Sequence, residues 1–142
     1  MVNDVSVLRE RNSMQIYYFS RTGRSKKIAE DLAARYGTEV RQIDDHKDWS
    51  GKINYMKAGA MAMSGKKIPV SYEKPDTDDD IVVVFPLWAG AMPPAIGTFV
   101  EEVGGNHITA VVTSLGSTLN KRDVFRKVID LVGNDIKAPD EL

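Results

Sequence analysis

The sequence predicts an α/β fold in which a doubly wound parallel sheet carries helices on both faces. Apolar runs of strand length alternate along the chain with longer segments of helical spacing, which is the order expected of βαβ units. Two of these runs, Ile81 to Phe85 and Ile108 to Val112, are continuously apolar, as strands are when both faces of their sheet are covered. The chain of 142 residues has the length of one domain with a single core.

Each expected element follows from its local pattern. The first strand, Met14 to Phe19, is rich in aromatic residues, and the helix after it places Ile28, Leu32 and Tyr36 at helical spacing. Glycines stand where helices should end, at Gly37, Gly104, Gly105 and Gly133. The expected elements in order are strand Met14 to Phe19, helix Ser25 to Tyr36, strand Thr38 to Ile43, helix Lys52 to Met63, strand Ile81 to Phe85, helix Pro94 to Val103, strand Ile108 to Thr113 and helix Lys121 to Val132.

The two ends of the chain complete this expectation. We expect the strand order 2-1-3-4 with a short or missing fifth strand, because only nine residues follow Gly133. The edge of the fourth strand would then be exposed. Residues 1–13 are expected to be an N-terminal extension of a domain at residues 14–142. Either this extension packs on its own domain or on a second subunit, making a homodimer, or it is a remnant before a start at Met14.

The turn after the first strand is suited to binding phosphate. It lies at a helix N-terminus, where the first backbone N–H groups lack intrahelical partners and the helix dipole is positive. Hydroxyl and guanidinium side chains add donors, and a glycine permits close approach of the backbone. Capping alone also favours such residues. The turn consists of Ser20, Arg21, Thr22, Gly23, Arg24 and Ser25.

Two later loops follow buried strands in the same way. Pro86 to Met92 comes after the third expected strand, and Thr113 to Thr118 comes after the fourth. In an open parallel sheet the carboxyl ends of the strands share one edge, and ligands bind in the crevice there. We therefore expect the three loops to surround one site.

Taken together, SRTGRS, FPLWAGAMPPAIGTFVEEV and TSLGST resemble the three flavin-holding loops of flavodoxins. The resemblance implies a flavodoxin-like three-layer sandwich, with flavin mononucleotide (FMN) as cofactor and its phosphate on residues 20–25. The loops Pro86 to Met92 and Thr113 to Thr118 would hold the ring. The implied ring-binding residues are Pro86, Leu87, Trp88, Ala89, Gly90, Thr113, Ser114, Leu115 and Gly116.

Two functions follow from this resemblance and from the residues. The first is an FMN-binding redox protein, either an electron carrier or a small flavin-dependent reductase, acting with a redox partner protein or a small-molecule electron acceptor. The second is a non-redox module that binds a phosphate ligand or a protein partner through the same loops. Trp88 would cover one face of the flavin, pack on the sheet edge, or meet a partner protein.

Composition argues against other classes. The net charge of −1 and pI near 6.1 give no basic surface for nucleic acid, and no apolar run approaches the length of a membrane span. A cytoplasmic protein is the default expectation. The chain has no cysteine, and the acidic run before Ile81 is typical of a solvated turn, so we expect no metal site.

Other candidate residues are weaker. The two histidines, His46 and His107, stand outside the three loops and are expected on the surface. Asp44 and Asp45 follow the second strand, but the first loop lacks the glycine pattern of a dinucleotide site. No Ser-His-Asp or Cys-His order is evident, so we expect no catalytic side chain.

Overall fold

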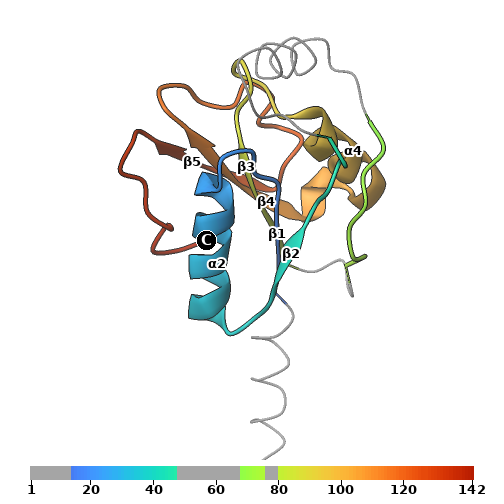
Figure 1. The fold of residues 1–142 in the computed structure, drawn as a ribbon, viewed down its shortest axis with the longest axis horizontal. Coiled ribbons are helices and arrows are strands. Elements are labelled where there is room, and N and C mark those ends of the chain that lie inside the picture. Colours follow the sequence, from blue (N-terminus) through green and yellow to red (C-terminus); the bar gives the residue numbers. More distant parts are fainter. Residues whose placement is uncertain (1–13, 48–67, 76–79) are drawn as a thin grey trace, which may run out of the picture.

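The computed structural model describes residues 14–47, 68–75 and 80–142 of the chain. These residues form a five-stranded, wholly parallel sheet in the order β2-β1-β3-β4-β5 (Figure 1). The strands are β1 (Gln15–Tyr18), β2 (Val40–Gln42), β3 (Ile81–Pro86), β4 (Ile108–Ser114) and β5 (Lys127–Val132). The helices are α2 (Arg24–Tyr36), α4 (Pro94–Val103) and the short 3-10 helix η1 (Gly105–His107). The fold has the flavodoxin-like arrangement that the sequence predicted.

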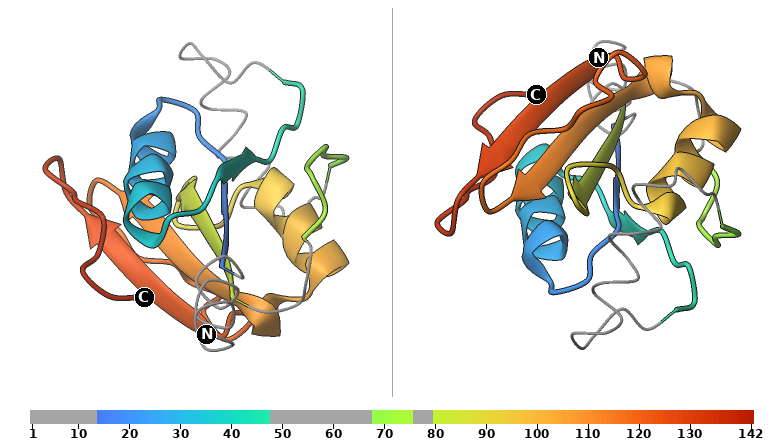
Figure 2. Two further views of the ribbon diagram at one scale, coloured as in Figure 1. Left: turned by 90° about the horizontal axis from the view of Figure 1, so that it is seen from below. Right: turned by 90° about the horizontal axis from the view of Figure 1, so that it is seen from above.

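Helices α2 and α4 lie on opposite faces of the sheet, which gives three layers (Figure 2). On one face, Leu32 of α2 packs in a cluster with Val82 and Val84 of β3. On the other face, Phe99 of α4 packs with Val83 and Phe85 of the same strand. Because successive side chains of a strand point to opposite faces, a continuously apolar strand such as β3 fills both cores at once.

The predicted helix Lys121 to Val132 is wrong. Its second half is strand β5, which pairs with β4 from Thr109↔Lys127 to Ser114↔Val132. In β5, Ile129 and Leu131 face the α2 cluster and Val128 faces the α4 cluster, which is the two-residue period of a strand. The fifth strand is therefore present, and the edge of β4 that we expected to be exposed is paired.

No helix forms in the connection between β4 and β5, residues 115–126. Leu119 and Phe125 are buried in the cluster on the α4 face, and the ring of Phe125 lies 5.9 Å from that of Phe85 between centroids. The Arg122 guanidinium donates to the Asp130 carboxylate at 2.6 Å. The Arg126 N–H donates to the carbonyls of Gly105 and Ile108. This irregular segment thus packs on the α4 face of the sheet, and it includes the first half of the segment expected to be the helix Lys121 to Val132.

The last residues cover the opposite face. Ile136, Ala138 and Leu142 pack against the α2 cluster, and the Arg35 guanidinium of α2 donates to the carbonyl of Pro139. Figure 1 shows the C-terminal segment running back beside α2. Gly133 follows a strand rather than the end of a helix, with φ of 119°. Residues 134–142 thus cover part of the α2 face without forming a helix.

Two expectations fall on parts of the chain that the structure does not describe. The helix Lys52 to Met63 and the extension at residues 1–13 both lie outside the described residues. Within the described ranges, none of the helices is both long and apolar enough to cross a membrane.

The connection before β5 leaves no room for a side chain at Gly105. A Cβ built on Gly105 would lie 1.9 Å from the carbonyl oxygen of Val124. We expect Gly105→Ala to lower the free energy of unfolding by about 1–3 kcal/mol or more, because two backbone segments must move apart. The matched control is Gly116→Ala, since an added Cβ meets no atom within 4 Å there. Urea unfolding measures both, and equal stability of the two variants would contradict the tight packing of this connection.

Candidate functional site

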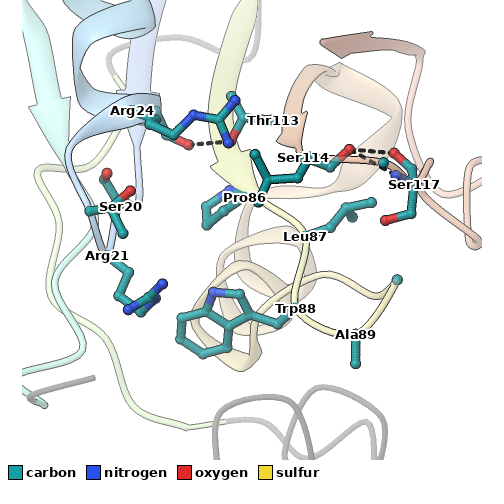
Figure 3. A pocket seen from close by; sticks show the side chains of 15 residues that line it. Ser20, Arg21, Arg24, Pro86, Leu87, Trp88, Ala89, Thr113, Ser114 and Ser117 are labelled. Atoms are coloured by element: carbon teal, nitrogen blue, oxygen red, sulfur yellow. Dashed lines mark hydrogen bonds between the residues drawn. The ribbon is translucent and has the colours of Figure 1, made fainter. Parts of the chain in front are cut away.

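A cavity of about 350 Å³ opens at the carboxyl ends of β1, β3 and β4 (Figure 3). It is lined by residues of all three predicted loops. The lining residues are Ser20, Arg21, Thr22, Arg24, Ser25, Pro86, Leu87, Trp88, Ala89, Gly90, Thr113, Ser114, Leu115, Gly116 and Ser117. Of the residues that the sequence assigned to the phosphate turn and to ring binding, all but Gly23 line the cavity. Ser117 lines it in addition, and it lies within the loop Thr113 to Thr118.

Gly23 shapes the first loop instead. It precedes α2 with φ of 96°, a left-handed conformation that a residue with a Cβ resists. Its N–H donates to Ser20 Oγ at 2.9 Å, and its carbonyl accepts the Lys27 N–H at 3.0 Å. Because Lys27 is the first residue bonded in this way, the preceding amides of α2 are left as the positive end of the helix.

A buried pair of hydroxyls joins the first loop to the third. Ser25 Oγ lies 2.9 Å from Thr113 Oγ1, and the two residues are only 1% and 2% exposed. The Thr113 carbonyl accepts the Leu87 N–H at 3.0 Å, which connects the second loop to the same residue. Thr113 therefore contacts both other loops, and the Ser25 hydroxyl serves first to dock α2 on β4.

Two arginines give the cavity its charge. The Arg24 guanidinium donates to the carbonyl of Gly133, so its position depends on the residue that follows β5. The side chain of Arg21 extends toward Trp88 (Figure 3). Among the described residues that line the cavity there is no aspartate or glutamate. The lining is therefore cationic at its α2 end, which favours an anionic ligand.

The second loop is a tight turn. Trp88 and Ala91 exchange two backbone hydrogen bonds, of 2.8 and 3.1 Å, and the two residues between them have positive φ, 54° at Ala89 and 79° at Gly90. These are features of a type I′ turn. In the part of the chain that the structure describes, the amides of Ala89 and Gly90 donate no hydrogen bond. The turn therefore presents two backbone donors beside the cavity.

Trp88 both packs and lines the cavity. It is 2% exposed, and its ring meets Phe19 nearly edge to face, with centroids 5.4 Å apart at 67°. Figure 3 shows the indole at the wall of the cavity, between Arg21 and Ala89. The sequence left packing and ligand contact as alternatives for this residue, and the fold allows both.

The third loop folds on itself. Ser114 Oγ donates to the Ser117 carbonyl at 2.5 Å and accepts the Ser117 N–H at 3.2 Å. Between them, Leu115 is 68% exposed. The amides of Leu115 and Gly116 donate to no acceptor among the described residues. This loop therefore adds two further backbone donors and an apolar side chain.

The other titratable groups lie away from the cavity. Burial raises the pKa of Tyr72, and its hydrogen bond of 2.7 Å to Glu102 and the charge of that carboxylate act in the same direction. Neither residue lines the cavity, and neither do His46 and His107. Among the described residues no three His, Cys, Asp or Glu side chains come together as metal ligands. The cavity itself is suited to binding rather than to acid–base chemistry.

The sequence itself has a distant relative among known proteins. No protein-family model matches the sequence. An uncharacterized protein of Archaeoglobus fulgidus is 28% identical over 99 residues, 70% of this chain, and the match spans 64% of that protein's length.

Three solved structures have the same fold. A flavoprotein of Lactobacillus acidophilus, crystallised in complex with FMN, matches with a TM-score of 0.63 and 18% identity, covering 86% of this chain and 93% of that one. A protein of Bacteroides eggerthii assigned as a flavoprotein gives 0.65 and 20%, covering 85% and 86%. One of Bacteroides uniformis, assigned in the same way, gives 0.64 and 20%, covering 87% and 92%.

The buried hydroxyl pair can be tested by a double-mutant cycle. Ser25→Ala or Thr113→Val alone leaves one buried hydroxyl without its partner, so each should cost about 1–3 kcal/mol of unfolding free energy. The double variant should cost less than the sum of the two, because it removes both polar groups. Urea unfolding of the four proteins measures the coupling, and strictly additive costs would show that the two hydroxyls do not interact.

Proposed function

We propose that this chain binds FMN in the cavity and works as a flavodoxin-like redox protein. The proposal rests mainly on one observation, that a single cavity has two chemically different halves. One half is the cationic N-terminus of α2, and the other is a slot bounded by Trp88 and by loops with backbone donors. A phosphorylated flavin has the same two halves. The fold shared with a flavoprotein crystallised with FMN supports the same assignment.

The first loop fits a phosphate group. The first amides of α2 point out of the helix, and the helix dipole favours negative charge by about 0.3–1 kcal/mol at such a position. Thr22 adds a hydroxyl, while Arg21 and Arg24 add guanidinium donors that pair well with phosphate oxygens. Ser20 and Ser25 act mainly by fixing the loop, through Gly23 and Thr113.

The other two loops fit a flat ring. Pro86, Leu87 and Trp88 supply apolar surface, and the amides of Ala89, Gly90, Leu115 and Gly116 are placed to meet carbonyl and nitrogen acceptors at the ring's rim. Stacking on an aromatic side chain contributes about 0.5–1.5 kcal/mol beyond burial of area. The cavity volume of about 350 Å³ lies in the range of small-molecule sites.

When bound, FMN would supply transfer of one or two electrons, and the protein would supply position and electrostatics. Among the described residues that line the cavity there is no Asp, Glu, His or Lys, so none of these residues offers a carboxylate, imidazole or amine for proton transfer. We infer that protons reach the site from solvent. A redox partner protein or a small-molecule acceptor would approach at the cavity mouth, where Leu115 is exposed.

FMN binding is tested by titrating the purified chain with FMN and with riboflavin. We expect FMN to bind more tightly, because only FMN carries the phosphate. Thr22→Val should weaken FMN binding by about 1–2 kcal/mol, a factor of roughly 5–30, and leave riboflavin binding unchanged. Thr118→Val is the matched control, since Thr118 is exposed and does not line the cavity.

Equal affinity for the two flavins would contradict the assignment of the first loop to the phosphate. Tight binding of inorganic phosphate without any binding of flavin would favour the alternative, a non-redox module that binds phosphate ligands. Binding of FMN without reduction by dithionite or exchange of electrons with acceptors would leave a flavin-binding module that is not a redox protein.

The charges around the cavity predict the reduction potential of bound FMN. The loops that would hold the ring, residues 86–92 and 113–118, contain no acidic side chain, so these loops do not oppose the addition of electrons through like charge. We expect the two-electron midpoint potential of the FMN complex to lie near that of free FMN. Spectroelectrochemical titration measures it. A value about 90 mV or more below free FMN, equivalent to about 4 kcal/mol, would contradict this electrostatic argument.

A further inference from the structure

A second constellation of reactive side chains lies outside the cavity, at the carboxyl end of β2. His46 Nε2 lies 2.8 Å from Ser71 Oγ, and His46 Nδ1 lies 3.3 Å from Asp44 Oδ2. The imidazole thus contacts a hydroxyl through one nitrogen and a carboxylate through the other, which is the order of contacts that activates a serine as a nucleophile. None of the three lines the cavity described above.

The backbone brings these residues together across a long interval of sequence. Asp44 and Ser71 form an isolated antiparallel bridge, with the Asp44 N–H donating to Ser71 O at 2.9 Å and the Ser71 N–H donating to Asp44 O at 2.8 Å. The sequence showed no Ser-His-Asp order because this bridge is not a local feature.

Both supporting segments are anchored. The Ile43 N–H donates to the Tyr18 carbonyl at 2.8 Å, which holds the end of β2 beside β1. Tyr72, which follows Ser71, packs its ring on Phe99 at 4.7 Å between centroids and donates its hydroxyl to Glu102. The serine and the aspartate are therefore carried by segments that are fixed to the sheet and to α4 (Figure 1).

The conformation of His46 directs its ring to its partners. His46 has φ of 58°, in the left-handed region that few residues other than glycine adopt. Its own N–H donates to Asp44 Oδ1 at 2.7 Å, which stabilises this conformation. One carboxylate thus holds both the backbone and the imidazole of His46, with a separate oxygen for each.

We propose that Ser71, His46 and Asp44 form an acyl-transfer site that hydrolyses esters of small carboxylic acids. Ser71 Oγ attacks the ester carbonyl, His46 Nε2 takes the hydroxyl proton, and Asp44 orients the imidazole and stabilises its charge. The C–O bond to the alcohol breaks, and the alcohol leaves with the proton from His46. Water then attacks the acyl group on Ser71 by the same route, which releases the acid and restores the hydroxyl.

The surroundings of the three residues define the substrate class. The His46 and Asp44 side chains are 63% and 46% exposed, so the site is open to solvent and suits small esters with a good leaving group rather than amides. The N–H of Tyr72, the residue after the nucleophile, donates to no acceptor in the described ranges. In α/β-hydrolases, the amide of the residue after the nucleophilic serine helps to stabilise the oxyanion.

Hydrolysis of p-nitrophenyl acetate by the purified full chain tests the proposal. We expect Ser71→Ala and His46→Asn to lower the rate at least tenfold and Asp44→Asn to lower it several-fold. Asn at position 46 tolerates the left-handed backbone, and Asn at position 44 keeps an oxygen for the His46 N–H. His107→Gln is the matched control, because it removes the other histidine of the chain and should retain the wild-type rate.

Covalent labelling gives an independent readout. A fluorophosphonate probe should modify Ser71 in the wild type, as mapped by peptide mass, and should fail to modify it in His46→Asn. Unaltered hydrolysis in Ser71→Ala, or labelling at other residues only, would overturn the proposal. Ser71→Ala keeps the backbone bridge, so its thermal midpoint and FMN affinity should match those of the wild type. Because the three residues lie outside the cavity, absence of FMN binding in the wild type would contradict the proposed function but not the proposed ester hydrolysis.

Discussion

The hydrogen bond between the buried hydroxyls of Ser25 and Thr113 is the contact on which the cavity depends. It fixes the first turn of α2 against the end of β4 over 88 residues of sequence. The Thr113 carbonyl also accepts the Leu87 N–H. Thr113, which belongs to the third loop, is therefore hydrogen-bonded to both other loops. In a low-dielectric interior an unpaired hydroxyl is costly, so the pair defines one position of the helix rather than several.

The electrostatics of the cavity follow from that position. With α2 docked on β4, its N-terminus and the two arginines face the same space, and Arg24 is held by the carbonyl of Gly133. The same carboxyl edge of the sheet also carries Asp44, whose carboxylate is engaged by His46. Cationic and anionic groups are thus separated along one edge, so an anionic ligand is directed to the α2 end while the His46 imidazole keeps its carboxylate partner.

The sequence predicted the strands and loops that follow from local residue patterns. It did not predict the features that depend on contacts between segments far apart in the chain. Strands β1, β3 and β4 were found because apolar runs such as that of β3 are typical of buried strands, and the loops at their ends were found because parallel strands bring such loops to one edge. The segment 121–132 has apolar residues at helical spacing, and its second half, KVIDLV, is also a short run rich in β-branched residues, so pattern alone is ambiguous there. Pairing with the open edge of β4 decides for the strand. The contact between Ser71 and His46 was not predicted for the same reason, because a backbone bridge between remote segments brings the two residues together.

The loss of the expected last helix has a consequence for the site. Where a helix follows a strand of a parallel sheet, its N-terminus adds a positive dipole at the carboxyl edge. Here the loop after β4 continues as the irregular segment 115–126 and is closed by hydrogen bonds between Ser114 and Ser117. Helix α4 begins at Pro94 with Pro93 before it, two residues that have no N–H and do not line the cavity. Among the described residues, α2 is therefore the helix whose dipole acts on the cavity. The positive field is concentrated where a phosphate would bind, and the region of a bound ring is left to neutral backbone donors and to the side chain of Arg21.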